Sequence, residues 1–359
     1  MKKIAIILPK DSEALFNKNC TRTFGGASVQ LYNIAKELWQ YNNIVTYSLI
    51  PKYQKIDFDD YDKFNLIMLY KETDNAFVKF IKMVKFLLQK KPDALIQRGL
   101  TLESCLVALL CKLCGVRFVF MFAHDVEAGG LRQKDRKPVL LMPLLIKYAS
   151  VLITQNSYQK QMLLNKYHKE SIIIYNGYDI PHYKPVKKKY ILWVARCDSW
   201  KQPELFIELA KKNKRIPFVM ICPKSANEQY YRTILNKAIN IPNCTFIDFV
   251  EYSEINEFFQ QAYIFVNTSL YEGFPQTFIQ ACMNHTPIVS LNVNPEECLT
   301  KHECGVFCNG SVDAMNAAIH KLWNNKAYWK TLSSNAYRYA VQYHDITKNV
   351  QQLVNLIFS

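Results

Sequence analysis

Glu272 lies at the end of a predicted strand, where a turn and a helix can aim it at a ligand. The apolar run 264–266 precedes it, and Gly273 and Pro275 form a turn before a helical pattern. A proline at the start of a helix leaves the next backbone amides facing outwards. Gln280, one to two turns into that helix, presents an amide toward the same space. The predicted ligand-facing group is Glu272, Gly273, Phe274, Pro275, Gln276, Thr277 and Gln280.

Two cations follow another predicted strand. Arg196 comes after the apolar run 190–194, and Lys201 follows before the helical segment 203–210. A guanidinium makes bidentate contacts with phosphate oxygens, an ammonium acts as a point charge, and a helix N-terminus adds positive potential. The pair therefore suits a pyrophosphate. Without the Glu272 segment, the simpler interpretation is two solvated surface cations.

Gly25 and Gly26 follow the first predicted strand and open the helical pattern 29–38. Glycines at such a place let backbone amides and a helix N-terminus approach a phosphate. The same pair also fits a plain turn, so both interpretations remain open.

His124 follows the apolar run 118–122, at the carboxyl end of a further predicted strand. A lone histidine is more often structural, but this position favours a role in placing a sugar or an acceptor. The basic segment 129–137 comes next and could close on an acidic acceptor.

The elements that position these residues alternate short apolar strands with helices. Strands that are apolar along their whole length are buried on both faces, as in a parallel sheet covered by helices. We predict an α/β protein with two such doubly wound, Rossmann-like domains. The strands are expected at 4–8, 44–49, 66–69, 94–96, 118–122, 151–154 and 172–175, and then at 190–194, 218–221, 245–247, 264–266 and 288–290.

The chain has 359 residues, more than one core usually organises. Prolines and a charge run at 181–189 predict a boundary between an N-terminal domain, 1–182, and a C-terminal domain, 189–344. The cleft between two such domains is the default binding site. The segment 345–359 is predicted to be a terminal helix that buries its apolar face, with the first domain as a candidate surface.

The segment 77–88 allows two interpretations. A helix that packs its apolar stripe on the core and exposes its lysines is the commoner arrangement. The alternative is a helix that rests on anionic lipid, which the apolar Met83 and Phe86 outside the stripe favour. The stripe consists of Phe77, Phe80, Ile81, Val84, Leu87 and Leu88, and the lysines are Lys79, Lys82, Lys85, Lys90 and Lys91.

The composition limits the class of protein. Half of the residues are hydrophobic, with 10 Gly and 14 Pro, which excludes a disordered chain. Cys111 and Cys114 form a lone CxxC within an apolar run, which indicates helix packing rather than a metal or redox site. No apolar run approaches the ~20 residues that cross a bilayer. Residues 1–9 indicate a strand rather than a signal peptide, so we expect a cytosolic protein.

The net charge of +15 is larger in the first half of the chain than in the second. A basic surface suits phospholipid, a lipid-linked diphosphate or nucleic acid. Aromatic and basic residues do not interleave in a recognition pattern, so nucleic acid is the least favoured of the three.

The chain resembles the retaining GT-B glycosyltransferases of family 4 (glycosyl transferases group 1) over nearly its whole length. The resemblance implies a hexosyltransferase that uses a nucleotide diphosphate sugar, needs neither metal nor cofactor, and makes cell-surface polysaccharide. Its acceptor would be a glycan or a lipid-linked glycan, at the inner face of the membrane as a peripheral protein. The motifs that carry the resemblance are Gly25-Gly26, His124-Asp125, Asn176-Gly177-Tyr178-Asp179, Arg196 with Lys201, and Glu272-Gly273-Phe274-Pro275.

The resemblance also implies roles for individual residues. Arg196 and Lys201 would hold the donor diphosphate and stabilise the leaving nucleotide. Glu272 would contact the hydroxyls of the donor sugar, and His124 would lie near that sugar. The amides near Phe274 to Thr277 would meet sugar and phosphate.

Gln280 departs from the family pattern, which has a second glutamate that binds the nucleotide ribose. A glutamine still donates and accepts hydrogen bonds, so we expect donor binding to persist. The lost charge leaves an alternative function, a non-catalytic nucleotide-sugar-binding subunit that stabilises an active glycosyltransferase. The Asp-x-Asp sequence at 57–60 is interpreted as a solvated loop, and no metal site is predicted.

Overall fold

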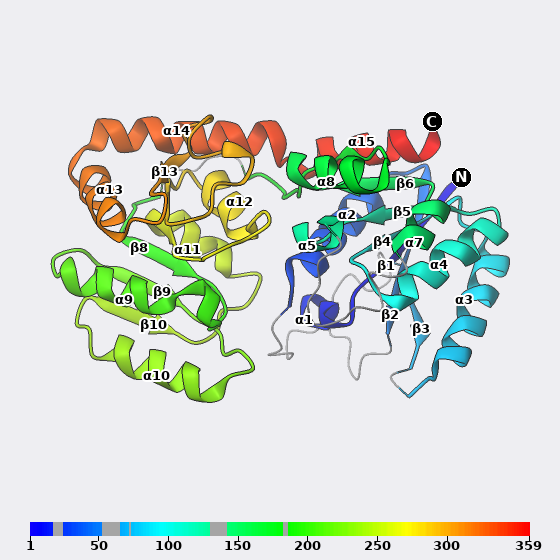
Figure 1. The fold of residues 1–359 in the computed structure, drawn as a ribbon, viewed down its shortest axis with the longest axis horizontal. Coiled ribbons are helices and arrows are strands. Elements are labelled where there is room, and N and C mark those ends of the chain that lie inside the picture. The colour runs from blue at the N-terminus through cyan, green and yellow to red at the C-terminus, as the bar shows by residue number, and fades with distance from the viewer. Residues whose placement is uncertain (17–23, 52–64, 72, 130–141, 182–185) are drawn as a thin grey trace. The chain divides into compact units, whose positions relative to one another are not determined.

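The computed structural model describes residues 1–16, 24–51, 65–71, 73–129, 142–181 and 186–359. They form two compact units (Figure 1). The first comprises Met1–Asp179 and Asp345–Ser359, and the second comprises Ile180–His344. The stretch 57–60, residues 130–137 of the basic segment and residues 182–185 of the expected boundary lie outside the described residues.

A seven-stranded parallel sheet forms the centre of the first unit, in the order β3-β2-β1-β4-β5-β6-β7. The central strands are apolar because helices cover both faces, and every residue of β4 is buried. The strands are β1 (Lys2–Ile7), β2 (Ile44–Pro51), β3 (Leu66–Tyr70), β4 (Ala94–Arg98), β5 (Arg117–Met121), β6 (Val151–Thr154) and β7 (Ile172–Ile173).

The helices of the first unit include one from the end of the chain. Helix α15 packs against α2, and its residues Leu353 and Ile357 are buried. The described helices of this unit are η1 (Lys10–Ser12), α1 (Glu13–Phe16), α2 (Gly26–Trp39), α3 (Ala76–Lys90), α4 (Leu102–Leu113), α5 (Asp125–Gly129), α7 (Met142–Tyr148), α8 (Ser157–Tyr167) and α15 (Ile346–Phe358).

The second unit repeats this architecture with a six-stranded parallel sheet in the order β10-β9-β8-β11-β12-β13. Its strands are β8 (Tyr190–Val194), β9 (Phe218–Ile221), β10 (Cys244–Ile247), β11 (Ala262–Asn267), β12 (Ile288–Ser290) and β13 (Gly305–Phe307). Its helices are η2 (Ser199–Lys201), α9 (Pro203–Lys212), α10 (Glu228–Ile239), α11 (Ile255–Gln261), α12 (Gln276–Met283), η3 (Pro295–Glu297), α13 (Val312–Asn324) and α14 (Lys326–Tyr343).

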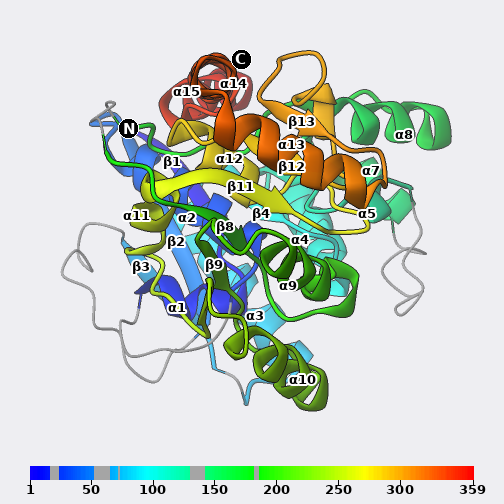
Figure 2. The same ribbon diagram turned by 90° about the vertical axis from the view of Figure 1, so that its left-hand side faces the viewer.

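Each sheet has a point where the order of its strands reverses. In the first unit this point lies between β1 and β4, and in the second it lies between β8 and β11. Figure 2 shows β8 and β11 side by side in the second unit. Ligands of open α/β sheets bind at the carboxyl ends of the two strands that flank such a point. The loops after β8 and β11 are therefore the first place to look for a site.

The prediction of an α/β fold with two parallel sheets is confirmed. Strand β13 was not predicted, because its three residues begin with Gly305 and make no long apolar run. A Cβ atom at Gly305 would lie 1.9 Å from the carbonyl oxygen of Ile288 on β12, so the close approach of the two strands requires glycine here. No described helix is long and apolar enough to span a membrane.

The expected core-facing stripe of 77–88 is wrong in its orientation. Helix α3 buries Met83, Phe86 and Leu87 against the sheet, whereas most of the predicted stripe is exposed. The helix carries two apolar faces, and its more regular face is not the one that packs on the core.

Candidate functional site

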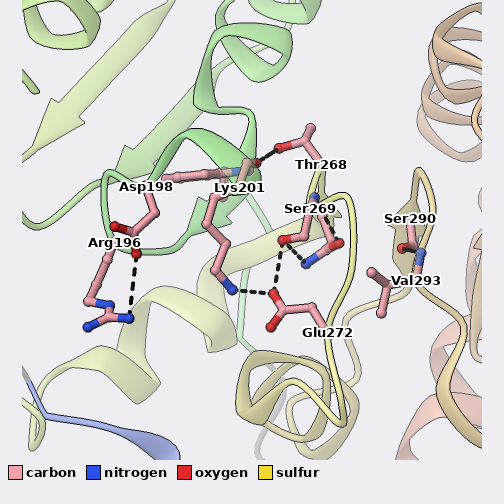
Figure 3. Close-up of polar contacts among 10 residues, drawn as sticks. Arg196, Asp198, Lys201, Thr268, Ser269, Glu272, Ser290 and Val293 are labelled. Atoms are coloured by element: carbon pink, nitrogen blue, oxygen red, sulfur yellow. Dashed lines mark hydrogen bonds and ion pairs between the residues drawn. The ribbon is translucent and has the colours of Figure 1, made fainter. Parts of the chain in front are cut away.

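The loops after β8 and β11 are bonded to each other. The amide of Leu270 donates to the carbonyl of Trp200 at 2.9 Å. The Thr268 hydroxyl donates to the carbonyl of Lys201 at 2.6 Å and accepts from Nε1 of the buried Trp193 at 2.9 Å. These bonds fix the two loops against each other at the switch point of the second sheet (Figure 3).

Lys201 and Glu272 form an ion pair between these loops (Figure 3). Each side chain is only 13% exposed, so the pair is shielded from water. The Ser269 hydroxyl donates to Oε1 of Glu272 at 2.9 Å, and this is the same oxygen that contacts Lys201. Burial lowers the pKa of Lys201, and the neighbouring Glu272 carboxylate opposes that shift. The structure thus brings together two residues that lie far apart in the sequence.

An aromatic pair supports the same loops. The rings of Trp200 and Tyr271 stack with their centroids 5.2 Å apart and their planes 9° from parallel. The ammonium of Lys201 lies 3.9 Å from the centroid of the Trp200 ring, which favours its charged form. Lys201 is therefore held by a carboxylate and an aromatic face. A diphosphate that binds it would compete with Glu272.

Arg196 lies more openly than Lys201. Its side chain is 52% exposed, and its Nη2 is 3.5 Å from Oδ2 of Asp198 (Figure 3). The hydroxyl of Ser225 donates to the other oxygen of Asp198. Because an exposed guanidinium keeps most of its N–H donors in water, Arg196 can bind an anion with those donors while it keeps its contact with Asp198.

The turn after Glu272 leads into α12 as the sequence predicts. Pro275 is the N-cap residue, with extended backbone, and α12 runs over Gln276–Met283. Phe274 is buried, and its ring centroid lies 4.8 Å from that of His344. The packed phenylalanine and the rigid proline together fix where the first amides of α12 lie.

Gln280 is 7% exposed within α12. Among the contacts of the described residues, none joins it to Lys201 or Glu272. Its carbonyl accepts from Nδ2 of Asn284 at 2.9 Å. The structure therefore brings Lys201 to Glu272. Gln280 is a buried residue of α12.

The glycine pair of the first unit contacts an acidic residue. The amide of Gly25 donates to Oδ2 of Asp11 at 2.6 Å, and the Ser28 hydroxyl donates to Oδ1 at 2.5 Å. Asp11 places a carboxylate at the N-terminus of α2, where the partial positive charge of the helix favours an anion. The site that sequence analysis assigned to a phosphate holds a carboxylate of the protein itself.

His124 is exposed on the loop after β5, and buried side chains bond the backbone of that loop. Oε2 of Glu127 accepts from the amide of Ala123 at 2.9 Å, and Nε2 of Gln155 donates to the carbonyl of Ala123 at 2.7 Å. Oε1 of Gln155 in turn accepts from Arg98 at 3.0 Å and from Asn176 at 2.8 Å. Gln155 therefore fixes the residue before His124.

Sequence analysis missed several residues of these two sites. In the second unit they are Asp198, Thr268 and Ser269, and in the first they are Asp11, Glu127 and Gln155. Asp198 and Ser269 lie within three residues of a predicted site residue, so a search of the neighbouring polar residues could have found them. Gln155 carries no such signal, because it meets Ala123, the residue before His124, only through the fold. In the described part of the chain, no three His, Cys, Asp or Glu residues gather as metal ligands.

Two doubly wound parallel sheets, the second with this pair of loops at its switch point, define the chain as a protein of the GT-B fold. HepE from Anabaena, solved with UDP and glucose, is similar with a TM-score of 0.77 over 99% of both chains, at 15% identity. Sucrose-phosphate synthase from Thermosynechococcus elongatus gives 0.76 over 99% of this chain and 98% of its own, at 14% identity. A TarM variant from S. aureus, solved with fondaparinux, α-GlcNAc-glycerol and UDP, gives 0.76 over 100% of both chains, at 14% identity.

The sequence match to a protein family lies in the second unit. Residues 179–339 match the family model named glycosyl transferases group 1. This range covers nearly all of Ile180–His344, so the match to this family lies in the second unit. No protein with curated annotation matches the sequence.

Proposed function

We propose that the protein transfers a hexose, with retention of configuration, from a nucleotide diphosphate sugar to a glycan or lipid-linked acceptor. The observation that carries this proposal is the shielded Lys201–Glu272 pair, with Arg196 on the same loop, at the switch point of the second sheet. We further propose that the reaction needs no metal and serves cell-surface polysaccharide synthesis at the inner face of the membrane.

The chemistry of these groups matches the charges that develop during the reaction. When the bond between the sugar C1 and the phosphate oxygen breaks, the sugar becomes cationic and the diphosphate gains negative charge. Arg196 and Lys201 stabilise the leaving diphosphate, because cations fixed in a shielded site act more strongly than water does. The acceptor oxygen attacks C1, and its proton passes to the leaving phosphate.

Glu272 orients the donor sugar in this scheme. Its carboxylate accepts hydrogen bonds from sugar hydroxyls while Ser269 keeps it in place. The amides at the start of α12 contact sugar or phosphate, and Gln280 bonds the nucleotide ribose. Within the first unit, we propose that Gly25 and Gly26 contact a phosphate in competition with the Asp11 carboxylate, and that His124 positions a sugar or an acceptor. HepE and the TarM variant, both solved with UDP, support a uridine nucleotide as the first donor base to test.

The test measures donor turnover by the purified protein with a panel of nucleotide sugars. We expect Glu272→Ala and Arg196→Ala each to lower product formation by about 10²-fold or more, as loss of one transition-state contact typically does. Lys211→Ala serves as the control, because its ion pair with Glu208 is exposed. Unchanged turnover in both site variants would refute the assignment of this site.

A second function rests on Gln280, an uncharged residue where the pattern of the family that the chain resembles has a glutamate. A non-catalytic subunit would bind a nucleotide sugar and stabilise an active partner. Calorimetry with the donor panel followed by a hydrolysis assay separates the two functions. Binding without any slow hydrolysis of the donor supports the subunit, whereas hydrolysis or transfer supports the enzyme.

A further inference from the structure

The outer face of α3 exposes large apolar side chains in a continuous row. Phe77 is 70% exposed, Ile81 48% and Leu88 57%. Phe80 is 42% exposed, and Val84 completes the row between them. Positions three, four, seven and eleven apart share one side of a helix. These five residues, here called the outer stripe, run along about 16 Å of the helix.

The inner face of the same helix packs on the core of the first unit. Met83 and Leu87 are each 1% exposed, and Phe86 packs edge-on against Tyr47 of β2, with ring centroids 6.0 Å apart. At 100° per residue the centre of the outer stripe lies about 120° around the helix from these residues. The outer stripe therefore does not belong to the core of the first unit, and Figure 1 shows α3 at the periphery of that unit.

Lysines accompany the outer stripe, and α3 has no acidic residue. Lys82 is paired with Asp74 at 2.5 Å, while Lys79 and Lys90 each lie 5.8 Å from a tyrosine ring. Lys85 and Lys91 are exposed and have no partner among the described residues. At 100° per residue Lys85 lies beside the outer stripe, and Lys91, the C-cap residue of α3 with a left-handed backbone, lies just beyond its end. An open hollow on this face is lined by Phe80, Ile81, Val84, Lys85, Leu88 and Gln89.

We infer that α3 docks on an anionic lipid surface, with the outer stripe inserted among the lipids and Lys85 and Lys91 on the headgroups. An apolar row flanked by cations matches the layers of an anionic membrane, which is apolar below and negative at its surface. A second copy of the chain fits poorly, because it would bring an equally basic helix against this one. Since no described helix can span a bilayer, contact in the plane of the membrane is the mode open to α3.

This inference deepens the proposed function, because docking would bring the protein to a lipid-linked acceptor. It does not require that the protein be an enzyme. Binding to lipid is measured without donor or acceptor, so its failure and the failure of the proposed function can be told apart.

The experiment is vesicle co-sedimentation of the full chain at physiological salt. One set of vesicles contains phosphatidylglycerol and phosphatidylcholine, and the other contains phosphatidylcholine alone. We expect binding to the anionic set only. Ile81→Ala should weaken this binding about tenfold, since it removes methyl and methylene groups that docking would bury in the lipid. The matched control is Ile239→Ala, which shortens a similarly exposed isoleucine at the end of α10 and should change nothing.

A charge variant tests the lysines. Lys85→Gln with Lys91→Gln should weaken binding about 25-fold, or roughly fivefold for each lysine. Lys326→Gln with Lys330→Gln on α14 removes the same charge from another exposed helix and should leave binding nearly intact. Because all these side chains are exposed, we expect each variant to keep the thermal midpoint of the wild type.

Three outcomes would overturn the inference. The first is a wild-type chain that stays in solution with anionic vesicles. The second is binding that Ile81→Ala and Ile239→Ala change equally, since attraction by net charge alone would then explain it. The third is a dimer in light scattering that Ile81→Ala dissociates, which would assign the outer stripe to a protein interface instead.

Discussion

The two units differ in how they hold the residues that could meet a ligand. In the second unit the charged groups contact each other directly, as Lys201 does with Glu272. In the first unit the corresponding groups are bonded to the surrounding protein: the Gly25 amide to Asp11, and the loop of His124 to Glu127 and Gln155. The second unit thus presents a charged site, whereas the first presents a backbone frame held by buried polar side chains.

This difference predicts where a substitution affects chemistry and where it affects the fold. A change in the second unit's site should alter turnover with little loss of stability. A change in a buried side chain that bonds the loops of the first unit should lower the stability of that unit. Turnover should then fall because less of the protein is folded. The following variants test that division, from the largest expected effect to the smallest.

Lys201→Met should reduce transfer by about 10²- to 10³-fold, because it removes the shielded cation from the leaving diphosphate. It also leaves the Glu272 carboxylate without its cation. Steady-state transfer and donor hydrolysis by the purified protein measure the effect. A rise in the KM of the donor, with kcat unchanged, would show that Lys201 binds the ground state and the transition state equally.

Gln155→Leu should destabilise the first unit by about 3 kcal/mol. It deprives Ala123, Arg98 and Asn176 of hydrogen bonds in a buried place. Urea unfolding measures the change. Gln161→Leu is the matched control, because Gln161 lies on the exposed side of the nearby α8, where its side chain bonds Asn165. Equal stability of the two variants would contradict the idea of a buried frame beneath His124.

The second unit should gain stability with rising pH because of Lys188. Burial lowers the pKa of Lys188 to about 7, while its Nζ donates to Asn284 and Thr286 at the end of α12. Between about pH 7 and 10.5 the unfolded chain binds this proton and the folded chain does not, so the free energy of unfolding rises with pH. We expect a gain of about 2 kcal/mol, discounted for the solvent access that remains.

Lys188→Met should remove that slope, since methionine keeps a similar length and does not titrate. Urea unfolding at pH 7 and at pH 9.5 checks it. A slope that persists in the variant would have to come from another group.

Asp11→Asn should lower the stability of the first unit by about 1 kcal/mol, because a charged acceptor at a helix N-terminus becomes a neutral one. The same change should tighten nucleotide binding severalfold if Gly25 and Gly26 contact phosphate, as a competing negative charge is removed. Calorimetry with UDP and with uridine measures this. An equal increase in affinity for UDP and for uridine would show that Asp11 does not compete with the phosphate.

The sequence indicates which residues follow the strands of the second sheet, because each of these groups belongs to one short segment. The turn around Pro275, the cations after β8 and the carboxylate after β11 each follow a strand, and parallel strands end at one edge of the sheet. The direct pairing of Lys201 with Glu272 could not be predicted, because it depends on the bonds that Thr268 and Leu270 make to the neighbouring loop.

The first unit shows where such prediction ends. Gln155 reaches Ala123 through tertiary packing, which leaves no spacing in the sequence to recognise, whereas Glu127 bonds Ala123 from only four residues away. Helix α3 shows a second limit, since periodicity finds an apolar face without telling what covers it. Met83 and Phe86, outside the regular stripe, lie in the core together with Leu87 from within it.

The return of α15 to the first unit makes the second unit a domain inserted into the first. The amide of Ile346 donates to the carbonyl of Tyr178 at 3.0 Å, and a Cβ atom at Gly177 would lie 2.9 Å from the Cα of Ile346. The two points where the chain leaves and re-enters the first unit are therefore already in contact. Closing the first unit with a short linker in place of 180–344 would cost little loop-closure entropy, so each unit is a natural piece for separate expression.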